Sequence, residues 1–165
     1  MKKYDVVIGI DPDVDKSGIA YVETESRMLE ATCLTFAELL DYLREAGEVL
    51  TERGKSFVVV VEAGWLNKAH WHVGKGGSAA RSAAIGNHTG RNHEVGRKIV
   101  EMCRHYGIEV VEQPPLRKMW KGKDGKITHE ELQHFTGITG KTNQETRDAA
   151  LLAWEYAGLP IRIKN

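Results

Sequence analysis

Four acidic residues of this chain stand where a carboxylate is either costly to bury or well placed to bind a cation. Asp11 ends the apolar run YDVVIGID, Glu62 ends the run FVVVVE, and Glu145 and Asp148 lie near the start of the segment NQETRDAALLAWEY. A carboxylate at the end of a buried strand loses its solvation, and a hydrogen-bonding group or a positive charge must compensate for the loss. Two strand ends and an acidic pair spaced i, i+3 can converge on one point, where a divalent cation would supply that charge.

Ligand sets made only of oxygen suit Mg²⁺ or Mn²⁺, so the four carboxylates predict a metal-dependent enzyme that acts on phosphate groups. Asp11 and Glu62 are the stronger pair, because a carboxylate at the end of a strand rarely follows an uninterrupted apolar run without a function. The alternative for both is an exposed position at the strand end, where the side chain caps a neighbouring turn. Glu145 and Asp148 have an alternative interpretation, since acidic residues near the start of a helix stabilise it through the helix dipole.

The net charge of zero hides an uneven distribution of charged residues. Residues 1–67 hold 7 Lys and Arg against 13 Asp and Glu, whereas residues 68–126 hold 12 against 5. A basic middle section beside an acidic site is typical of a nuclease, because Lys and Arg bind the phosphate backbone. The alternative is a surface helix that carries Lys and Arg only for solubility. The candidate phosphate contacts are Lys75, Arg81, Arg91, Arg97, Arg117, Lys118, Lys121, Lys123 and Lys126, with Arg117, Lys118 and Lys121 favoured.

The elements that must position these residues follow from the apolar pattern. Strands are expected over residues 4–11, 18–24, 29–34, 57–61 and 108–113, and helices over 36–53, 82–106, 129–135 and 143–156. Thr35 with Glu38, and Thr128 with Glu131, have the spacing of capping boxes. The run FVVVV lacks alternation, which indicates a central strand covered on both faces. This order predicts an α/β fold with a mixed five-stranded sheet flanked by helices.

Length and composition bound the remaining possibilities. A chain of 165 residues with 41% hydrophobic content fits one domain, 1–165, with a substantial core. No segment approaches the roughly 20 apolar residues that a membrane span needs, so a cytoplasmic protein is expected. Cys33 and Cys103 are isolated and are expected to be reduced thiols. His70 and His72 form H-W-H, a spacing unlike a zinc site.

The chain resembles the RuvC-type Holliday-junction resolvases of the RNase H-like nuclease superfamily. VVIGIDPDVDKSGIAYVE is similar to the first hairpin of that family, and FVVVVEAGW to its strand that ends in a catalytic Glu followed by an aromatic residue. ETRDAALLAWEYA is similar to its final helix with two acidic residues. Asp13 stands where the family has Gly, and Glu145 where it has Asp.

The resemblance implies that Asp11, Glu62, Glu145 and Asp148 are the catalytic and metal-binding set. It implies two Mg²⁺ (or Mn²⁺) ions, which in such sites lie roughly 3.5–4 Å apart, and hydrolysis of DNA phosphodiesters in Holliday (four-way) junctions. Trp65 would contact nucleic acid beside the scissile bond, with Trp71 and Trp120 as weaker candidates, and the lysines that bind DNA would include Lys126. The alternative for Trp65 is a buried aromatic side chain that closes the core. A homodimer is expected, because two symmetric strands are cut.

Other functions stay open from the sequence. The same fold serves nucleases that act on flaps or on RNA–DNA hybrids, and a non-catalytic nucleic-acid-binding protein could retain it. The opening motif D-P-x-x-x-x-x-G is similar to that of sugar kinases and actin-like ATPases, but those are usually much longer and lack the four carboxylates.

Overall fold

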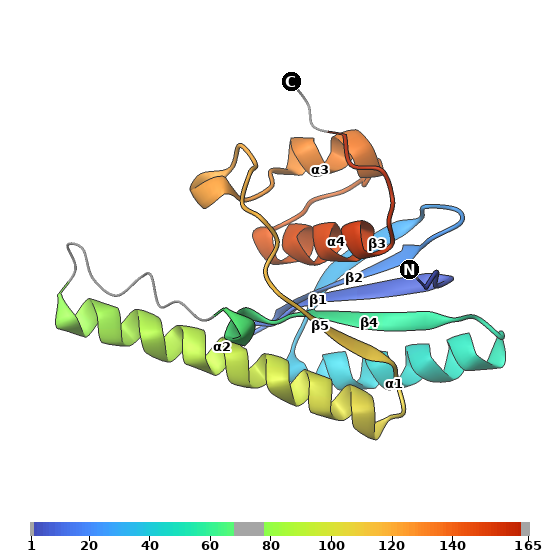
Figure 1. Cartoon of the computed structure of the whole chain (residues 1–165), viewed down its shortest axis with the longest axis horizontal. Helices are drawn as coiled ribbons and strands as arrows, with labels where there is room; N and C mark the ends of the chain where they lie inside the picture. Colours follow the sequence, from blue (N-terminus) through green and yellow to red (C-terminus); the bar gives the residue numbers. More distant parts are fainter. Residues whose placement is uncertain (1, 68–77, 163–165) are drawn as a thin grey trace.

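The central sheet brings strands from both halves of the chain side by side. A computed structural model describes residues 2–67 and 78–162. Within them a mixed five-stranded sheet has the order β3-β2-β1-β4-β5 (Figure 1). The strands are β1 Val6–Asp11, β2 Ser17–Glu23, β3 Leu29–Leu34, β4 Phe57–Glu62 and β5 Val110–Gln113. The first three strands form an antiparallel meander, and β4 and β5 run parallel to β1.

Helices cover both faces of the sheet. Figure 1 shows α1 and α2 on one face and α3 and α4 on the other. Their bounds are α1 Phe36–Glu52, α2 Ala79–His105, α3 His129–Thr136 and α4 Gln144–Tyr156, with short 3₁₀ turns at Gly64–Leu66 and Lys123–Gly125. β4 is central as predicted: Val58 and Val60 face the core under α4, while Val59 and Val61 face the core under α1 and α2.

Most predicted element boundaries agree with the structure. Both capping boxes are present, at Thr35 for α1 and at Thr128 for α3. The start of α2 was predicted too late: the helix begins at Ala79, because the Ser78 side chain accepts a hydrogen bond from the Arg81 N–H and caps it. β5 is shorter than predicted, since residues 108 and 109 lie outside the strand.

Two glycines allow α4 to lie directly on the sheet. A Cβ atom at Gly9 of β1 would lie 2.5 Å from the Ala149 carbonyl oxygen, and one at Gly18 of β2 would overlap the Glu145 carbonyl oxygen. Gly18 is the register partner of Asp11. The close approach therefore sets the first turns of α4 beside the end of β1.

The first half of α2 extends beyond the sheet (Figure 1), and residues 83–91 are exposed on all sides. Among the described residues, Gly86 and Gly90 have no atom within 4 Å of where a Cβ would lie, so no packing against this part of the chain requires them. The second half packs on the core through Gly96, Ile99, Val100 and Cys103. No helix in the described part of the chain has the length and hydropathy to cross a bilayer.

Candidate active site

The sheet places Asp11 and Glu62 side by side. β1 and β4 are parallel neighbours with Ile10 opposite Val61, so the next residue of each strand is one of these carboxylates. The preceding residues are fully buried, which leaves both carboxylates at the boundary between the core and a cavity. The apolar runs thus position the two acidic side chains at the same edge of the sheet.

Asp148 joins them from α4. Asp11, Glu62 and Asp148 all line one cavity of about 520 Å³. Glu145 lies one helical turn before Asp148 and contacts Gly18 through its backbone, but it does not line the cavity. The structure therefore brings three of the four predicted carboxylates together and places the fourth beside them.

The electrostatics of the site show that its negative charge is only partly compensated. Burial raises the pKa of Asp11 well above its ordinary value, and the charges of Glu62, Asp148 and Glu145 raise it further. Burial also raises the pKa of Glu62, with a further contribution from Asp148. Lys126 acts in the opposite direction on both groups. A pair of neighbouring carboxylates with raised pKa values, here Asp11 and Glu62, is typical of catalytic sites.

Lys126 is the cation that reaches into this cluster. Its Nζ lies 3.3 Å from Asp148 Oδ2, and the other oxygen of Asp148 accepts a hydrogen bond of 2.7 Å from Gln144 Nε2. Burial alone would lower the pKa of the Lys126 ammonium group, but the carboxylates of Asp148, Asp11 and Glu62 outweigh it and raise that pKa. Lys126 was predicted as a phosphate contact, and its described partner is a carboxylate.

The walls of the cavity come from α2 and from residues 114–127, here called the basic segment, which links β5 to α3. Ser82, Gly86 and Gly90 line it from α2, and Arg117 and Lys118 line it from the basic segment. Both basic side chains belong to exposed residues. Asp11, Glu62 and Asp148 thus form the acidic floor of the cavity, and Arg117 and Lys118 form its basic wall.

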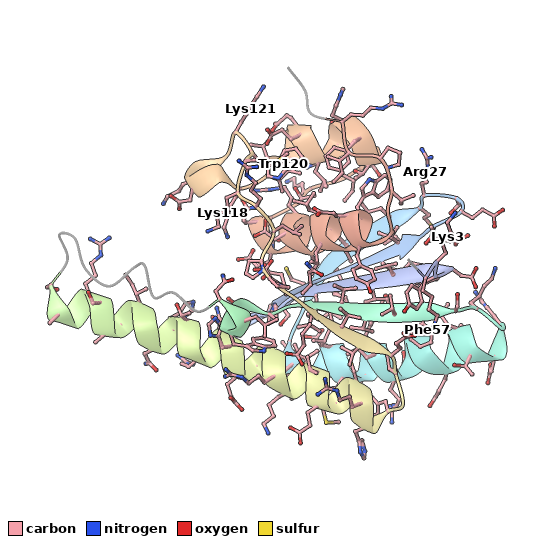
Figure 2. The ribbon with its side chains drawn as sticks, viewed as in Figure 1. Lys3, Arg27, Phe57, Lys118, Trp120 and Lys121 are labelled. Carbon is pink, nitrogen blue, oxygen red and sulfur yellow. The ribbon has the colours of Figure 1, made fainter. Side chains whose placement is uncertain are left out.

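The other predicted basic contact, Lys121, does not line the cavity. Figure 2 shows Lys118 on the part of the basic segment nearer α2, and Lys121 farther from α2, beside α3. The backbone N–H of Lys121 donates to the buried Glu131 carboxylate at 3.0 Å, and Thr128 donates to the same group. The α3 capping box therefore also fixes the shape of the basic segment.

Trp65 is held by contacts within the chain. It is half-buried, its indole N–H donates to Glu112 Oε2 at 2.9 Å, and a Cβ at Gly96 would lie 2.5 Å from its ring. Arg97 lies over the ring at 5.5 Å from its centroid. Trp65 is not among the residues that line the cavity, and its contact with nucleic acid stays a prediction.

The donor set fits a hard divalent cation. The floor of the cavity offers carboxylate oxygens, and a cation would offset the repulsion that raises the pKa values of Asp11 and Glu62. Within residues 2–67 and 78–162, no three His, Cys, Asp or Glu side chains lie close enough together to bind one metal ion.

Two residues of this region were not singled out from the sequence. Gln144 directly precedes Glu145, and Arg147 lies between Glu145 and Asp148. Gln144 donates a hydrogen bond to Asp148, and Arg147 donates one to the Ile127 carbonyl oxygen. The i, i+4 spacing of Gln144 and Asp148 was the available signal, because Gln and Asp at that spacing form hydrogen bonds on a helix. Four residues considered earlier lie outside the described residues: His70, Trp71, His72 and Lys75.

Comparison with known proteins identifies solved structures that share the fold of this chain. No protein-family model and no curated protein matches the sequence. The structure of Thermus thermophilus RuvC in complex with a Holliday junction substrate is similar over 93% of each chain, with 17% identity and a TM-score of 0.51. Another Thermus thermophilus RuvC structure is 18% identical, with a TM-score of 0.45, over 93% of this chain and 97% of that one. The Fowlpox virus resolvase in complex with Holliday junction DNA is 12% identical, with the same TM-score and coverage. The first likeness confirms the predicted RNase H-like α/β fold, a mixed five-stranded sheet flanked by helices.

Proposed function

We propose that this protein is a metal-dependent endonuclease that hydrolyses DNA phosphodiesters and that its substrate is the four-way junction. The observation that supports it most is the convergence of Asp11, Glu62 and Asp148 on a cavity whose wall carries Arg117 and Lys118. Acidic oxygens that bind cations, next to exposed cations that bind phosphate, are the two requirements of phosphodiester hydrolysis by a metal nuclease.

The proposed mechanism assigns each group a task. Asp11, Glu62 and Asp148 would hold Mg²⁺ or Mn²⁺, with Glu145 as a further ligand. When bound, such ions, two per site by analogy with other nucleases, would supply an activated water molecule and a positive charge for the leaving oxygen. Lys118 and Arg117 would hold the phosphates of the scissile strand against the floor of the cavity.

Lys126 has a separate task in this mechanism. Its ammonium group lies 3.3 Å from Asp148 and interacts with Asp11 and Glu62. It would keep the carboxylates ionised, because a nearby positive charge favours the charged form of an acid. Ionised carboxylates are the form that binds metal.

The choice of a four-way junction rests on the fold. Thermus thermophilus RuvC was determined with a Holliday junction substrate, and its fold matches 93% of this chain. A substrate panel tests the choice: four-way junction, flap, RNA–DNA hybrid and single strand, each with Mg²⁺. Preferred cleavage of the junction is expected. Preference for a flap or hybrid would assign another nuclease activity, and binding without cleavage would assign a nucleic-acid-binding protein.

The carboxylate assignment has its own test. Asp11→Asn is expected to reduce the rate of junction cleavage at least about 100-fold, more than most changes to groups that only support metal ligands. The matched control is Asp41→Asn on α1, because Asp41 is 72% exposed and its partner is Arg44 on the same helix. Cleavage by Asp11→Asn at the wild-type rate would contradict the proposed active site.

The proposal includes a cytoplasmic homodimer. Two symmetric cuts in one junction need two active sites, and two-fold symmetry supplies them. The exposed half of α2, residues 79–91, offers a surface for the second copy. A molar mass near that of two 18.4 kDa chains in light scattering is expected. A monomer that still makes both cuts would remove this part of the proposal.

A further inference from the structure

We propose that Gln144 and Arg147 are positioning residues that fix the orientation of the Asp148 carboxylate for metal binding. The inference rests on the proposed function, because the orientation of Asp148 matters for chemistry only if this group binds a metal ion. It concerns two side chains that do not line the cavity themselves.

Gln144 holds one oxygen of Asp148 in a defined direction. Its Nε2 donates to Asp148 Oδ1 at 2.7 Å and to the Ile127 carbonyl oxygen at 3.3 Å. Its Oε1 accepts a hydrogen bond of 3.1 Å from Arg147 Nη2. Because the amide has acceptors on its nitrogen side and a donor on its oxygen side, only one orientation satisfies all three partners.

Arg147 connects Gln144 to the backbone of two neighbouring loops. Its Nε donates to the Ile127 carbonyl oxygen at 3.1 Å, and its Nη1 donates to the Thr142 carbonyl at 3.2 Å and to the Thr142 hydroxyl at 3.1 Å. The hydroxyl of Thr142 also lies 2.9 Å from His129 Nδ1, at the start of α3. A guanidinium group is planar and always charged, so contacts in several directions hold it rigidly.

The same network reaches both oxygens of Asp148. Gln144 contacts Oδ1, and Lys126 contacts Oδ2. Lys126 directly precedes Ile127, and the carbonyl oxygen of Ile127 accepts hydrogen bonds from both Gln144 and Arg147. The carboxylate is therefore fixed from two sides by groups that share one backbone anchor at Ile127. Hydrogen-bonded groups behind a metal ligand typically change metal affinity or activity by roughly 10–100-fold.

A purely structural role is the competing explanation, since Arg147 also closes the loop before α4. Gln144→Met separates the two roles, because it keeps the length and helix preference of the side chain and removes only the amide. The matched control is Gln133→Met on α3. Gln133 likewise donates to a loop carbonyl, that of Ile138 at 3.2 Å, but it does not line the cavity, and no hydrogen bond of its side chain to Asp148 is described.

The experiment measures Mn²⁺ binding to the intact protein without DNA, together with the Mg²⁺ dependence of junction cleavage and the melting temperature. Gln144→Met is expected to weaken Mn²⁺ binding about 10-fold or more. It should also lower kcat at limiting Mg²⁺ without changing KM for the junction, and excess Mg²⁺ should restore kcat. Arg147→Lys keeps the positive charge but loses the planar guanidinium group, so it is also expected to weaken Mn²⁺ binding. Gln133→Met is expected to behave as wild type.

Wild-type Mn²⁺ affinity in a folded Gln144→Met protein would overturn the inference while leaving the proposed nuclease intact. A wild-type protein that binds Mn²⁺ but cuts no nucleic acid would overturn the proposed function, and the Mn²⁺ affinities would still decide the role of Gln144. A wild-type protein that binds no Mn²⁺ would overturn the inference, because Asp148 would then not be a metal ligand.

Discussion

At the scale of single residues, the site brings several carboxylates together at a buried position, where their negative charge destabilises the folded chain. The pKa of Asp11 is raised first by burial and then by Glu62 and Asp148. Lys126 compensates only part of this repulsion, since the pKa of Glu62 is also raised despite its presence. Such strain is common at functional sites, where stability is lost in favour of chemistry.

Asp11→Asn is therefore expected to stabilise the protein in the absence of divalent cations. Because the pKa of Asp11 is higher in the folded protein than in the unfolded chain, its proton stabilises the fold at low pH. That stability is lost as pH rises through the folded-state pKa. At pH 7 with a chelator, the variant should unfold with a free energy on the order of 1 kcal/mol or more above wild type.

Urea denaturation in chelator measures this difference at pH 7 and again below the ordinary carboxyl range, where the gain should vanish because both states are protonated. Added Mg²⁺ should reverse the order by stabilising only the wild type. A variant less stable than wild type at pH 7 in chelator would show that the charge of Asp11 is well compensated.

At the scale of elements, the exact approach of helices to the sheet sets the geometry of the site. Gly9 and Gly18 allow α4 to contact β1 and β2 through backbone atoms, which brings Asp148 to the end of β1. On the other face, Gly96 allows α2 to pack on Trp65, and Trp65 in turn bonds to Glu112 of β5. Glycine in a helix costs stability, so its presence at a contact has a packing reason.

The glycines of α2 give a matched pair of substitutions. Gly96→Ala is expected to lower the free energy of unfolding by about 1–3 kcal/mol, because the added Cβ would lie 2.5 Å from the Trp65 ring. Gly86→Ala, on the exposed half of the same helix, meets no atom of the described residues within 4 Å and should be neutral or stabilising by up to about 1 kcal/mol. Chemical denaturation of both variants measures the difference, and equal effects would contradict the packing described for Trp65.

At the scale of the whole molecule, the cavity combines an acidic floor with a basic wall at one edge of the sheet. Lys118 lines the cavity, whereas Lys55 precedes β4 and lies at the opposite end of that strand from Glu62. If nucleic acid binds at the carboxylates as proposed, Lys118 lies beside it and Lys55 does not. The arrangement predicts that DNA binding depends on salt and on the position of each lysine.

Affinity for a four-way junction is expected to fall steeply with salt, because phosphate contacts release counterions. Lys118→Gln should reduce the slope of log affinity against log salt by about 1. Lys55→Gln is the control and should leave the slope unchanged. Lys121→Gln shows how far the interface extends, since Lys121 lies outside the cavity. Fluorescence anisotropy over a salt series measures these slopes, and a flat response in the wild type would exclude a phosphate-binding basic wall.

The sequence by itself determined the fold class, the order of elements and the positions of Asp11 and Glu62. Apolar runs without alternation specify buried parallel strands, and parallel neighbours end at the same edge of a sheet. The capping boxes of α1 and α3 were also predictable, since they depend on residues three apart.

Only the tertiary structure decided which predicted residues meet. Asp148 lines the cavity and Glu145 does not, because the close packing of α4 on Gly18 sets which of its faces points inward. Lys126 pairs with Asp148, Trp65 packs on α2, and Gln144 and Arg147 bond to Ile127, all contacts between residues distant in sequence or element. Such contacts depend on the relative placement of whole elements, which local patterns of residue type do not encode.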